Sequence, residues 1–463
     1  MHMFANRLKT DDSHDVPKRR ARKTRVLIVS DHPVESRDVA KNLRALDLDI
    51  QLSLFDGQTL TSMPTHLPDA VLCHLVDYAE QGSNVAKVIR SHFKSNHFPL
   101  IGAMSRPSSE EALEFDSTLF APMHPSQIAN RVNAMIRLGV MEDEITRRLE
   151  TLRDNFGQTI TIGDMHPDRK FRVLFIGKAA PSFMVIINAL QDKGVEVTAA
   201  FTSFSAFDYL HDVPFDAVVM NTLEQVEPAF SIAEAMRRNS KLYHTPTLFL
   251  VKGDSFKDFE GAYKRGARDI IDCNADSNEI SGRILELANF HRIHEQMKLD
   301  FKTIALKHVG DKSGTAYSQQ FIKAHFPRIL RDAQETNRPV TLIGLRLNAS
   351  SIEAVADHAI AAAFDQTADL IHNLVRMQDV VCRWDDNKFV LSFFNTDKTE
   401  ARIILDRINA LLDCTVYDNG QIGGSPLNIS AQTSILEVCP TDNSAYNHLD
   451  ALIRQLMVDP DEA

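Results

Sequence analysis

The sequence is poor in cysteine and tryptophan: its 463 residues include five cysteines and one tryptophan. The cysteines are scattered, with no Cys-x-x-Cys pair and no Cys/His spacing of a metal site. This pattern argues against a disulfide framework and predicts buried thiols in a reducing cytoplasm. The five positions are Cys73, Cys273, Cys382, Cys414 and Cys439.

Long apolar segments are also missing. No apolar run approaches the roughly 18 residues that a membrane-spanning helix needs, and the first residues lack the apolar core of a secretory signal. The composition, 44% hydrophobic and 24% charged, is typical of a globular protein. We therefore expect a cytoplasmic protein without a membrane span.

Positive charge is scarce, because 51 Lys and Arg residues face 62 Asp and Glu residues and leave a net charge of −11. An acidic chain is a poor candidate for nucleic-acid binding. The exception is the basic run 18–25, which reaches into a polar N-terminal segment. A disordered basic tail over residues 1–22 is favoured over contact with nucleic acid or an anionic membrane, because the run has no aromatic residues and no amphipathic helix around it.

A repeat occupies the first two thirds of the chain, whose length alone predicts two to four domains. Three short apolar segments each recur 147 residues later in the chain, so that Arg25 corresponds to Arg172. The matching segments are 25–30 with 172–177, 68–74 with 215–221, and 98–103 with 245–250. Helical spacing lies between them, so each copy predicts buried parallel strands alternating with helices. We expect two tandem doubly wound α/β domains of the flavodoxin-like type, at 23–140 and 168–292.

Both copies resemble the receiver domains of response regulators, in which an Asp at the end of the third strand accepts a phosphoryl group. The resemblance implies that His74 and Asn221 occupy the phosphoacceptor positions. The other positions also differ from the family pattern: the acidic pair reads Ser30-Asp31 and Gly177-Lys178, and the lysine positions hold Ala121 and Asp272. Without a second metal carboxylate, we expect pseudo-receivers kept for packing and dimerisation.

Two connectors follow the predicted receivers. Residues 141–167 predict a helical linker that continues the last helix of the first receiver, with Ile145, Leu149 and Leu152 on one face. A second apolar stripe over 284–297 leads into a linker helix at 293–310. Such a stripe is usually a seam that packs on its own domain. A coiled coil between protomers is the alternative, although only two to three heptads are available.

From about residue 311 the pattern changes to an α/β domain that ends near 457, with a short tail at 458–463. Its predicted order is a helix at 317–335, a strand at 339–347, a helix at 355–375, strands at 380–384 and 389–394 around the turn 385–388, a helix near 403–412 and a strand at 427–436. This order and the stretch 376–389 resemble a GGDEF domain, the diguanylate cyclase family. The expected fold is thus two receiver domains followed by a GGDEF domain.

The catalytic positions that the resemblance identifies have lost their usual residues: they are Arg346, Ala354, Asp385, Asp386, Asn387 and Lys388. A cyclase holds GTP through divalent cations on carboxylates and through a glycine turn that lets the backbone approach the nucleotide. We therefore expect no bound metal and no diguanylate cyclase activity. GTP binding without turnover, with Arg346 and Lys388 on phosphate, remains an alternative.

The Arg-x-x-Asp pair is present as Arg376 and Asp379. Asp379 lies ten residues before Phe389. The resemblance implies that these residues and Arg407 bind cyclic di-GMP. Arginine can pair with guanine O6 and N7 or with phosphate, and aspartate can accept from the guanine edge. The alternative is an ordinary ion pair or helix cap.

Together these features predict a protein that senses cyclic di-GMP without making it. The resemblance implies a homodimer, no cofactor beyond the ligand, and protein partners such as adaptors or protease-targeting factors, in cell-cycle control at a cell pole. Two other hypotheses stay open: a cyclase with residual activity and an interaction scaffold that binds no nucleotide.

Overall fold

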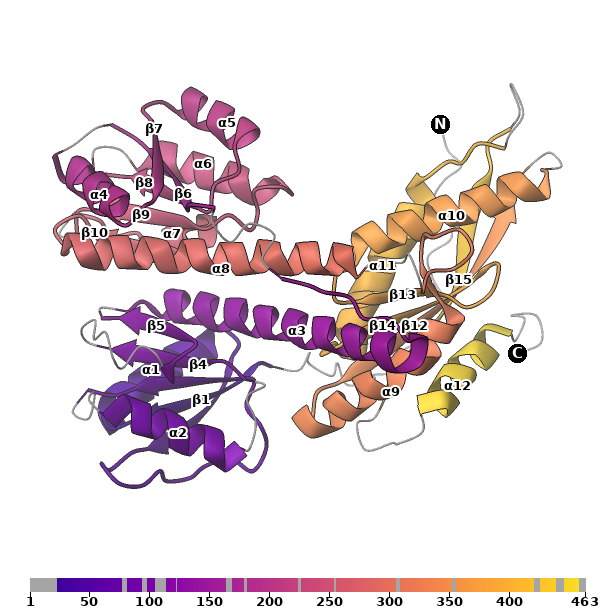
Figure 1. The fold of residues 1–463 in the computed structure, drawn as a ribbon, viewed down its shortest axis with the longest axis horizontal. Coiled ribbons are helices and arrows are strands. Elements are labelled where there is room, and N and C mark those ends of the chain that lie inside the picture. Colours follow the sequence, from indigo (N-terminus) through magenta and orange to yellow (C-terminus); the bar gives the residue numbers. More distant parts are fainter. Residues whose placement is uncertain are drawn as a thin grey trace, which may run out of the picture.

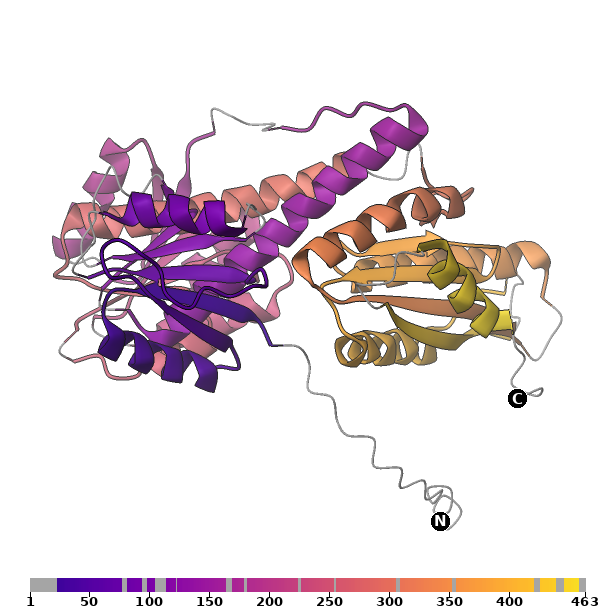
Figure 2. The ribbon, with the colours of Figure 1, turned by 90° about the horizontal axis from the view of Figure 1, so that it is seen from below.

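The computed structural model describes residues 23–76, 81–93, 98–104, 114–121, 123–163, 169–178, 181–223, 226–253, 255–304, 309–351, 355–419, 425–438 and 445–457. These residues form three five-stranded sheets. Two α/β domains lie on either side of a pair of long helices, and the third domain lies beyond one end of that pair (Figures 1 and 2). The predicted N-terminal tail, the C-terminal tail and Ala354 lie outside the described residues.

The first domain has the doubly wound order β2-β1-β3-β4-β5, with all pairs parallel. Its elements are β1 (Arg25–Ser30), α1 (Pro33–Ala45), β2 (Asp49–Leu54), β3 (Ala70–His74), α2 (Gly82–Phe93), β4 (Leu100–Met104), β5 (Ser117–Phe120) and α3 (Pro125–Phe156). The three predicted strands of this copy are confirmed. Residues 55–69 form no helix between β2 and β3, so this receiver departs from a strict alternation.

The second domain repeats the same order, read from the other edge as β10-β9-β8-β6-β7. Its elements are β6 (Arg172–Ile176), α4 (Pro181–Asp192), β7 (Glu196–Ala200), α5 (Ser203–Asp212), β8 (Ala217–Asn221), α6 (Glu227–Arg238), β9 (Thr247–Val251), α7 (Phe259–Arg265), β10 (Asp269–Asp272) and α8 (Ser277–Thr303). The repeated strands therefore occupy equivalent places in both sheets.

The two receivers pack on each other within the chain. The side chain of Gln127, at the start of α3, donates to Asp269 Oδ1 of β10 at 2.6 Å. From α8, Glu286 accepts the backbone N–H of Thr118 at 3.1 Å, and the His124 ring stacks on Tyr263 with centroids 5.2 Å apart. The β5–α3 side of the first receiver thus meets the α7–β10–α8 side of the second.

Both connector helices are shorter than the sequence pattern suggested. The helix α3 ends at Phe156 rather than continuing to residue 167, because Gly157 takes the left-handed φ of 63° that ends a helix. Likewise α8 ends at Thr303 instead of 310. The apolar face of α3 is covered by the third domain, since Ile145 and Leu152 share a core with that domain's first helix.

The stripe on α8 is also a seam inside the chain. Ile284 and Leu287 belong to the core of the second receiver, while Phe290 and Met297 pack against the core of the first. Because these residues are already in contact with both receivers, the structure favours the seam interpretation over a coiled coil between protomers.

The third domain has the sheet order β11-β13-β14-β12-β15, with β12 antiparallel to both β14 and β15. Its elements are β11 (Tyr317–Ser318), α9 (Gln319–Thr336), β12 (Val340–Ser350), α10 (Asp357–Leu374), β13 (Val380–Arg383), β14 (Lys388–Phe394), α11 (Lys398–Cys414), β15 (Asn428–Val438) and α12 (Ala445–Met457). The predicted start of the first helix at Tyr317 was wrong: Ser318 is the N-cap and accepts the N–H of Phe321.

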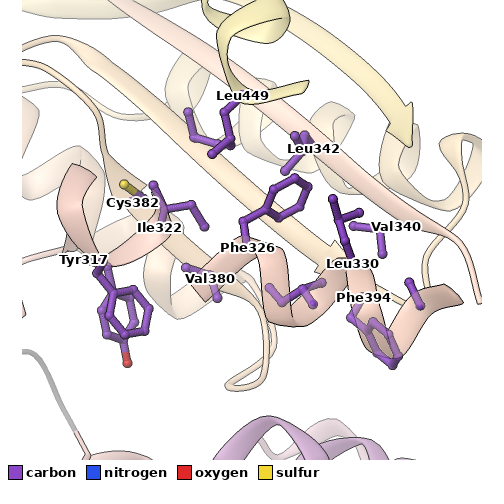
Figure 3. Close-up of a cluster of buried hydrophobic side chains, with 14 of the residues drawn as sticks. Tyr317, Ile322, Phe326, Leu330, Val340, Leu342, Val380, Cys382, Phe394 and Leu449 are labelled. Carbon is purple, nitrogen blue, oxygen red and sulfur yellow. The ribbon is translucent and has the colours of Figure 1, made fainter. Parts of the chain in front are cut away.

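Apolar side chains at helical spacing explain why α9 lies on the sheet. Ile322, Phe326 and Leu330 point from one face of α9 toward Val340 and Leu342 of β12 (Figure 3). All five side chains are buried. This core sets the position of β12, and with it the hairpin that pairs along its edge.

Candidate functional site

A tight hairpin joins β13 and β14 at the place where a catalytic turn was expected. The backbone N–H of Trp384 donates to the carbonyl of Lys388 at 2.8 Å, so Lys388 begins the second strand and is not part of the turn as predicted. Asn387 is tied to the neighbouring strand, because its side chain donates to the carbonyl of Leu347 at 3.1 Å. The hairpin is therefore anchored at both ends.

Two cationic residues lie opposite each other on neighbouring strands beside this turn. The antiparallel register of β12 and β14 makes Arg346 the cross-strand partner of Lys388. The ammonium of Lys388 lies 3.2 Å from Asp385 Oδ2. The backbone N–H of Asp386, followed by Lys388, lowers the pKa of the Asp385 carboxyl, which stays ionised and exposed.

This arrangement suits an anion better than a divalent cation. Magnesium binds oxygen ligands such as carboxylates, and a nearby positive side chain repels it. Within the part of the chain that the structure describes, no cluster of three His, Cys, Asp or Glu side chains is placed to hold a metal ion.

The Arg-x-x-Asp pair forms a closed turn between α10 and β13. The buried carboxylate of Asp379 accepts the backbone N–H of Arg376 at 2.9 Å, and the N–H of Asp379 donates back to the carbonyl of Arg376 at 2.9 Å. Burial raises the pKa of Asp379 to about 7, although the Arg376 charge opposes the shift. The guanidinium of Arg376 is exposed.

The third predicted ligand-binding residue lies on another element. Arg407 is exposed on α11, and no hydrogen bond or ion pair between described residues joins it to Arg376 or Asp379. The structure thus brings Arg376 and Asp379 together through the backbone and leaves two guanidinium groups facing solvent. The carboxylate of Asp379 does not face solvent, because it is buried and already accepts the backbone N–H of Arg376.

Arg148 of α3 holds this turn from the other side, and the sequence pattern did not reveal it. Its guanidinium donates to the carbonyls of Met377 and Asp379, each at 3.1 Å, and to the hydroxyl of Tyr317 at 3.1 Å. The residue is 2% exposed. The connector helix therefore makes direct contact with the Arg-x-x-Asp turn.

A buried carboxylate neutralises that arginine. Glu144 lies 2.6 Å from Arg148, 3.0 Å from Arg147 and 3.1 Å from His325 of α9. Burial opposes ionisation of Glu144, but His325, Arg148 and Arg147 outweigh it and hold its pKa well below the ordinary range. The signal in the sequence was the spacing of Glu144, Arg147 and Arg148, which places them on one helical face.

In the first receiver, His74 stands at the end of β3, where the phosphoacceptor was expected. Its Nε2 lies 4.0 Å from Glu35 Oε2, and burial lowers its pKa. Asp31 is engaged elsewhere, because its two carboxylate oxygens accept the N–H of Val76 at 2.9 and 3.0 Å. Ala121 is exposed at the position where the family has a lysine.

In the second receiver, Asn221 ends β8 and its amide is bonded on both sides. It donates to the carbonyl of Lys178 at 2.9 Å and accepts the N–H of Leu223 at 3.0 Å. Asp272, at the lysine position, accepts the N–H groups of Gly253 and Asn274. Each of these side chains stabilises its own turn and ties it to the loop after a neighbouring strand.

The fold consists of two tandem doubly wound α/β domains of the receiver type followed by a GGDEF-type α/β domain. The chain is similar to the response regulator PleD of Caulobacter vibrioides, at 20% identity over 434 residues that cover 89% of this chain and 90% of that protein. No protein-family profile matches the chain.

Solved structures resemble single domains. The GGDEF domain of DgcB from Caulobacter crescentus, in complex with c-di-GMP, shares 14% identity over 32% of this chain and 85% of that chain, with a TM-score of 0.27. The chemotaxis response regulator CheY4 of Vibrio cholerae shares 20% identity over 26% of this chain and 99% of that chain, with a TM-score of 0.24. Among the described helices, none is long and apolar enough to cross a membrane.

Proposed function

We propose that this protein is a non-catalytic effector that binds cyclic di-GMP through Arg376, Asp379 and Arg407 and recruits protein partners. In this respect it resembles PopA, the non-catalytic relative of PleD that acts in cell-cycle-regulated proteolysis at a cell pole. The observation that carries the proposal is the strand register that places Arg346 on β12 opposite Lys388 on β14.

That pairing removes the basis for catalysis. A cyclase needs carboxylates there to hold divalent cations on the GTP phosphates. A cation placed about 4 Å from a like charge costs on the order of 1 to 4 kcal/mol per unit charge, depending on the local dielectric. Two positive side chains in place of two negative ones therefore oppose metal binding twice, once by losing ligands and once by repulsion.

The proposed binding of cyclic di-GMP depends on two exposed arginines and on one buried carboxyl. The exposed guanidinium groups of Arg376 and Arg407 can pair bidentately with guanine or with phosphate. Asp379 needs its ionised form to accept from the guanine edge. Because the pKa of this buried carboxyl is about 7, the fraction of Asp379 that is ionised and can accept changes with pH near neutrality.

Coupling between the ligand and a partner surface runs through α3. A ligand shifts a conformational equilibrium only when it binds two arrangements differently. Because Arg148 holds the carbonyl of Asp379, a ligand that moves this turn also changes the packing of α3 on the receivers. Candidate partner-binding residues are three exposed phenylalanines: Phe201, just before α5, and Phe204 and Phe207 on α5, of which Phe204 is 78% exposed.

A calorimetric titration with cyclic di-GMP tests binding. Arg376→Ala and Arg407→Ala are expected to abolish the heat seen with the wild type, whereas Arg402→Ala, which removes another exposed arginine of α11, is the matched control. Equal binding by all four proteins would contradict the assigned site. A parallel incubation with GTP and Mg²⁺ is expected to form no dinucleotide.

One observation favours a second function, an interaction scaffold that binds no nucleotide. The Asp379 carboxylate is buried and already accepts the N–H of Arg376. A scaffold would give no heat with cyclic di-GMP, and Arg376→Ala would not alter partner binding. The effector proposal requires both measurements to respond.

A further inference from the structure

A cationic cavity lies between the two receivers, where α3 and α8 run side by side (Figure 1). It has a volume of about 90 Å³ and opens to solvent, and the residues around the start of β9 complete its wall. None of its lining residues is acidic, although the chain carries a net charge of −11. Its lining includes the arginines Arg131, Arg137 and Arg268 and the histidines His244, His291 and His294; burial lowers the pKa of His244 to about 3 and that of His291 to about 4, so these two rings are neutral near pH 7.

Two of these arginines are not neutralised by the protein. No described residue forms a hydrogen bond or an ion pair with the guanidinium of Arg137 or of Arg268. Burial lowers the pKa of each, and the charge of Arg137 adds to the lowering at Arg268. Two partly desolvated like charges in one cavity destabilise the protein unless an anion joins them.

Other arginines of the same interface are paired with carboxylates. Arg131 lies 2.7 Å from Glu286 and donates to Ser117. Arg283 is paired with Asp269. The interface therefore supplies a carboxylate to these two arginines, which hold the domains together, and it supplies none at Arg137 and Arg268.

The rest of the wall suits a ring. Leu138, Pro246, Leu287 and Phe290 give it an apolar surface, and the rings of His244 and His294 lie with centroids 4.3 Å apart. A bare phosphate would leave this surface uncovered. Apolar walls with a few convergent polar groups are typical of sites for small organic ligands.

We propose that this cavity binds a nucleotide, with its phosphate between Arg137 and Arg268 and its base against the apolar wall and the histidine pair. The site is separate from the proposed cyclic di-GMP contacts at Asp379 and Arg407. The inference does not depend on the proposed function.

The test is a calorimetric titration of the full-length protein with pyrophosphate, ATP, GTP and cyclic di-GMP in separate runs. We expect at least one nucleotide to bind more tightly than pyrophosphate. Arg137→Gln and Arg268→Gln should each weaken that binding about tenfold or more, because each removes charged hydrogen bonds to phosphate. Lys302→Gln is the matched control, an exposed charge on α8 outside the cavity.

Thermal melting separates a ligand site from a structural role. Without nucleotide, Arg137→Gln should melt at the wild-type temperature or above it, because a repulsive pair is removed, while stabilisation by nucleotide should be lost. A lower melting temperature with unchanged nucleotide affinity would overturn the proposal. So would the absence of binding by all four compounds in the wild type.

The variant Arg376→Ala distinguishes the two sites. Nucleotide binding at the cavity should persist in this variant even where cyclic di-GMP binding is lost. If Arg376→Ala abolishes all nucleotide binding and Arg137→Gln abolishes none, the cavity is not a site. Failure of cyclic di-GMP to bind the wild type would count against the proposed function only.

Discussion

The guanidinium of Arg148 donates a hydrogen bond of 3.1 Å to the backbone carbonyl of Asp379, joining the helix that leaves the first receiver to the turn that carries the Arg-x-x-Asp pair. More than 200 residues of sequence separate the two ends of this contact. It gives the receivers a direct mechanical connection to the proposed ligand site.

Removing this arginine should destabilise the junction. Arg148→Met leaves Glu144 buried with one cation fewer, which costs roughly 3 kcal/mol for a broken buried pair. We expect a lower melting temperature, faster proteolysis between α3 and α9, and weaker cyclic di-GMP binding. Arg153→Met, on the same helix but with its side chain 63% exposed, should change none of these. Unchanged melting in Arg148→Met would contradict the structural role.

The double variant Glu144→Gln with Arg148→Met provides a further check. It removes the buried charge together with its partner, so much of the lost stability should return. Cyclic di-GMP binding should stay weak, because the carbonyls of Met377 and Asp379 still lack their donor. Recovery of both properties would show that Arg148 acts only through Glu144.

Asp379 should make ligand binding depend on pH. Its folded-state pKa of about 7 lies above the ordinary value of 3.8, mainly because of burial. The neutral form dominates below pH 7, so cyclic di-GMP affinity should rise as pH increases from 6 to 8. Calorimetry across this range measures it, and a flat profile would contradict the assigned role of the carboxylate.

The same shift predicts an effect on stability. Because the folded pKa is raised, the stability that the neutral carboxyl contributes is present below the unfolded value near 3.8 and is lost as pH rises through 7. Asp379→Asn keeps an acceptor for the N–H of Arg376 without a buried charge. At pH 8 this variant should melt on the order of a few degrees higher while losing ligand affinity. A lower melting temperature at that pH would contradict the burial argument.

The pair Arg346 and Lys388 predicts how GTP responds to metal. In the wild type, Mg²⁺ should not increase affinity for GTP, because no carboxylate set receives it. The variant Arg346→Asp with Lys388→Glu places two carboxylates on adjacent strands and should acquire a Mg²⁺-dependent gain. The control Arg346→Gln with Lys388→Gln removes the cations without adding ligands, and a gain there would point to charge alone.

The second receiver should not regain phosphotransfer through one substitution. Asn221→Asp restores a carboxylate at the end of β8, but the position after β6 still reads Gly177 and Lys178 instead of an acidic pair. Without a metal site, the phosphoryl charge is not offset. Mass spectrometry after incubation with acetyl phosphate should detect no modification in either protein, and labelling of Asn221→Asp would contradict this.

The sheets were predictable because their strands are buried on both faces and repeat at a constant offset, as Arg25 and Arg172 show. The hairpin was predictable from the polar turn between two apolar segments. The Arg148 contact was not, because a charged residue on a helix gives no sign of a partner 231 residues away. Nor could the pattern show that the carboxylate of Asp379 is buried, since tertiary packing decides whether an acidic residue beside a strand faces solvent.

The most direct measurement of the central claim is a calorimetric titration of the purified wild-type protein with cyclic di-GMP at pH 8, with GTP and Mg²⁺ incubated in a matched sample. Our account predicts saturable heat from the dinucleotide and no dinucleotide formed from GTP. A titration without heat, or a product peak in the GTP sample, would contradict it.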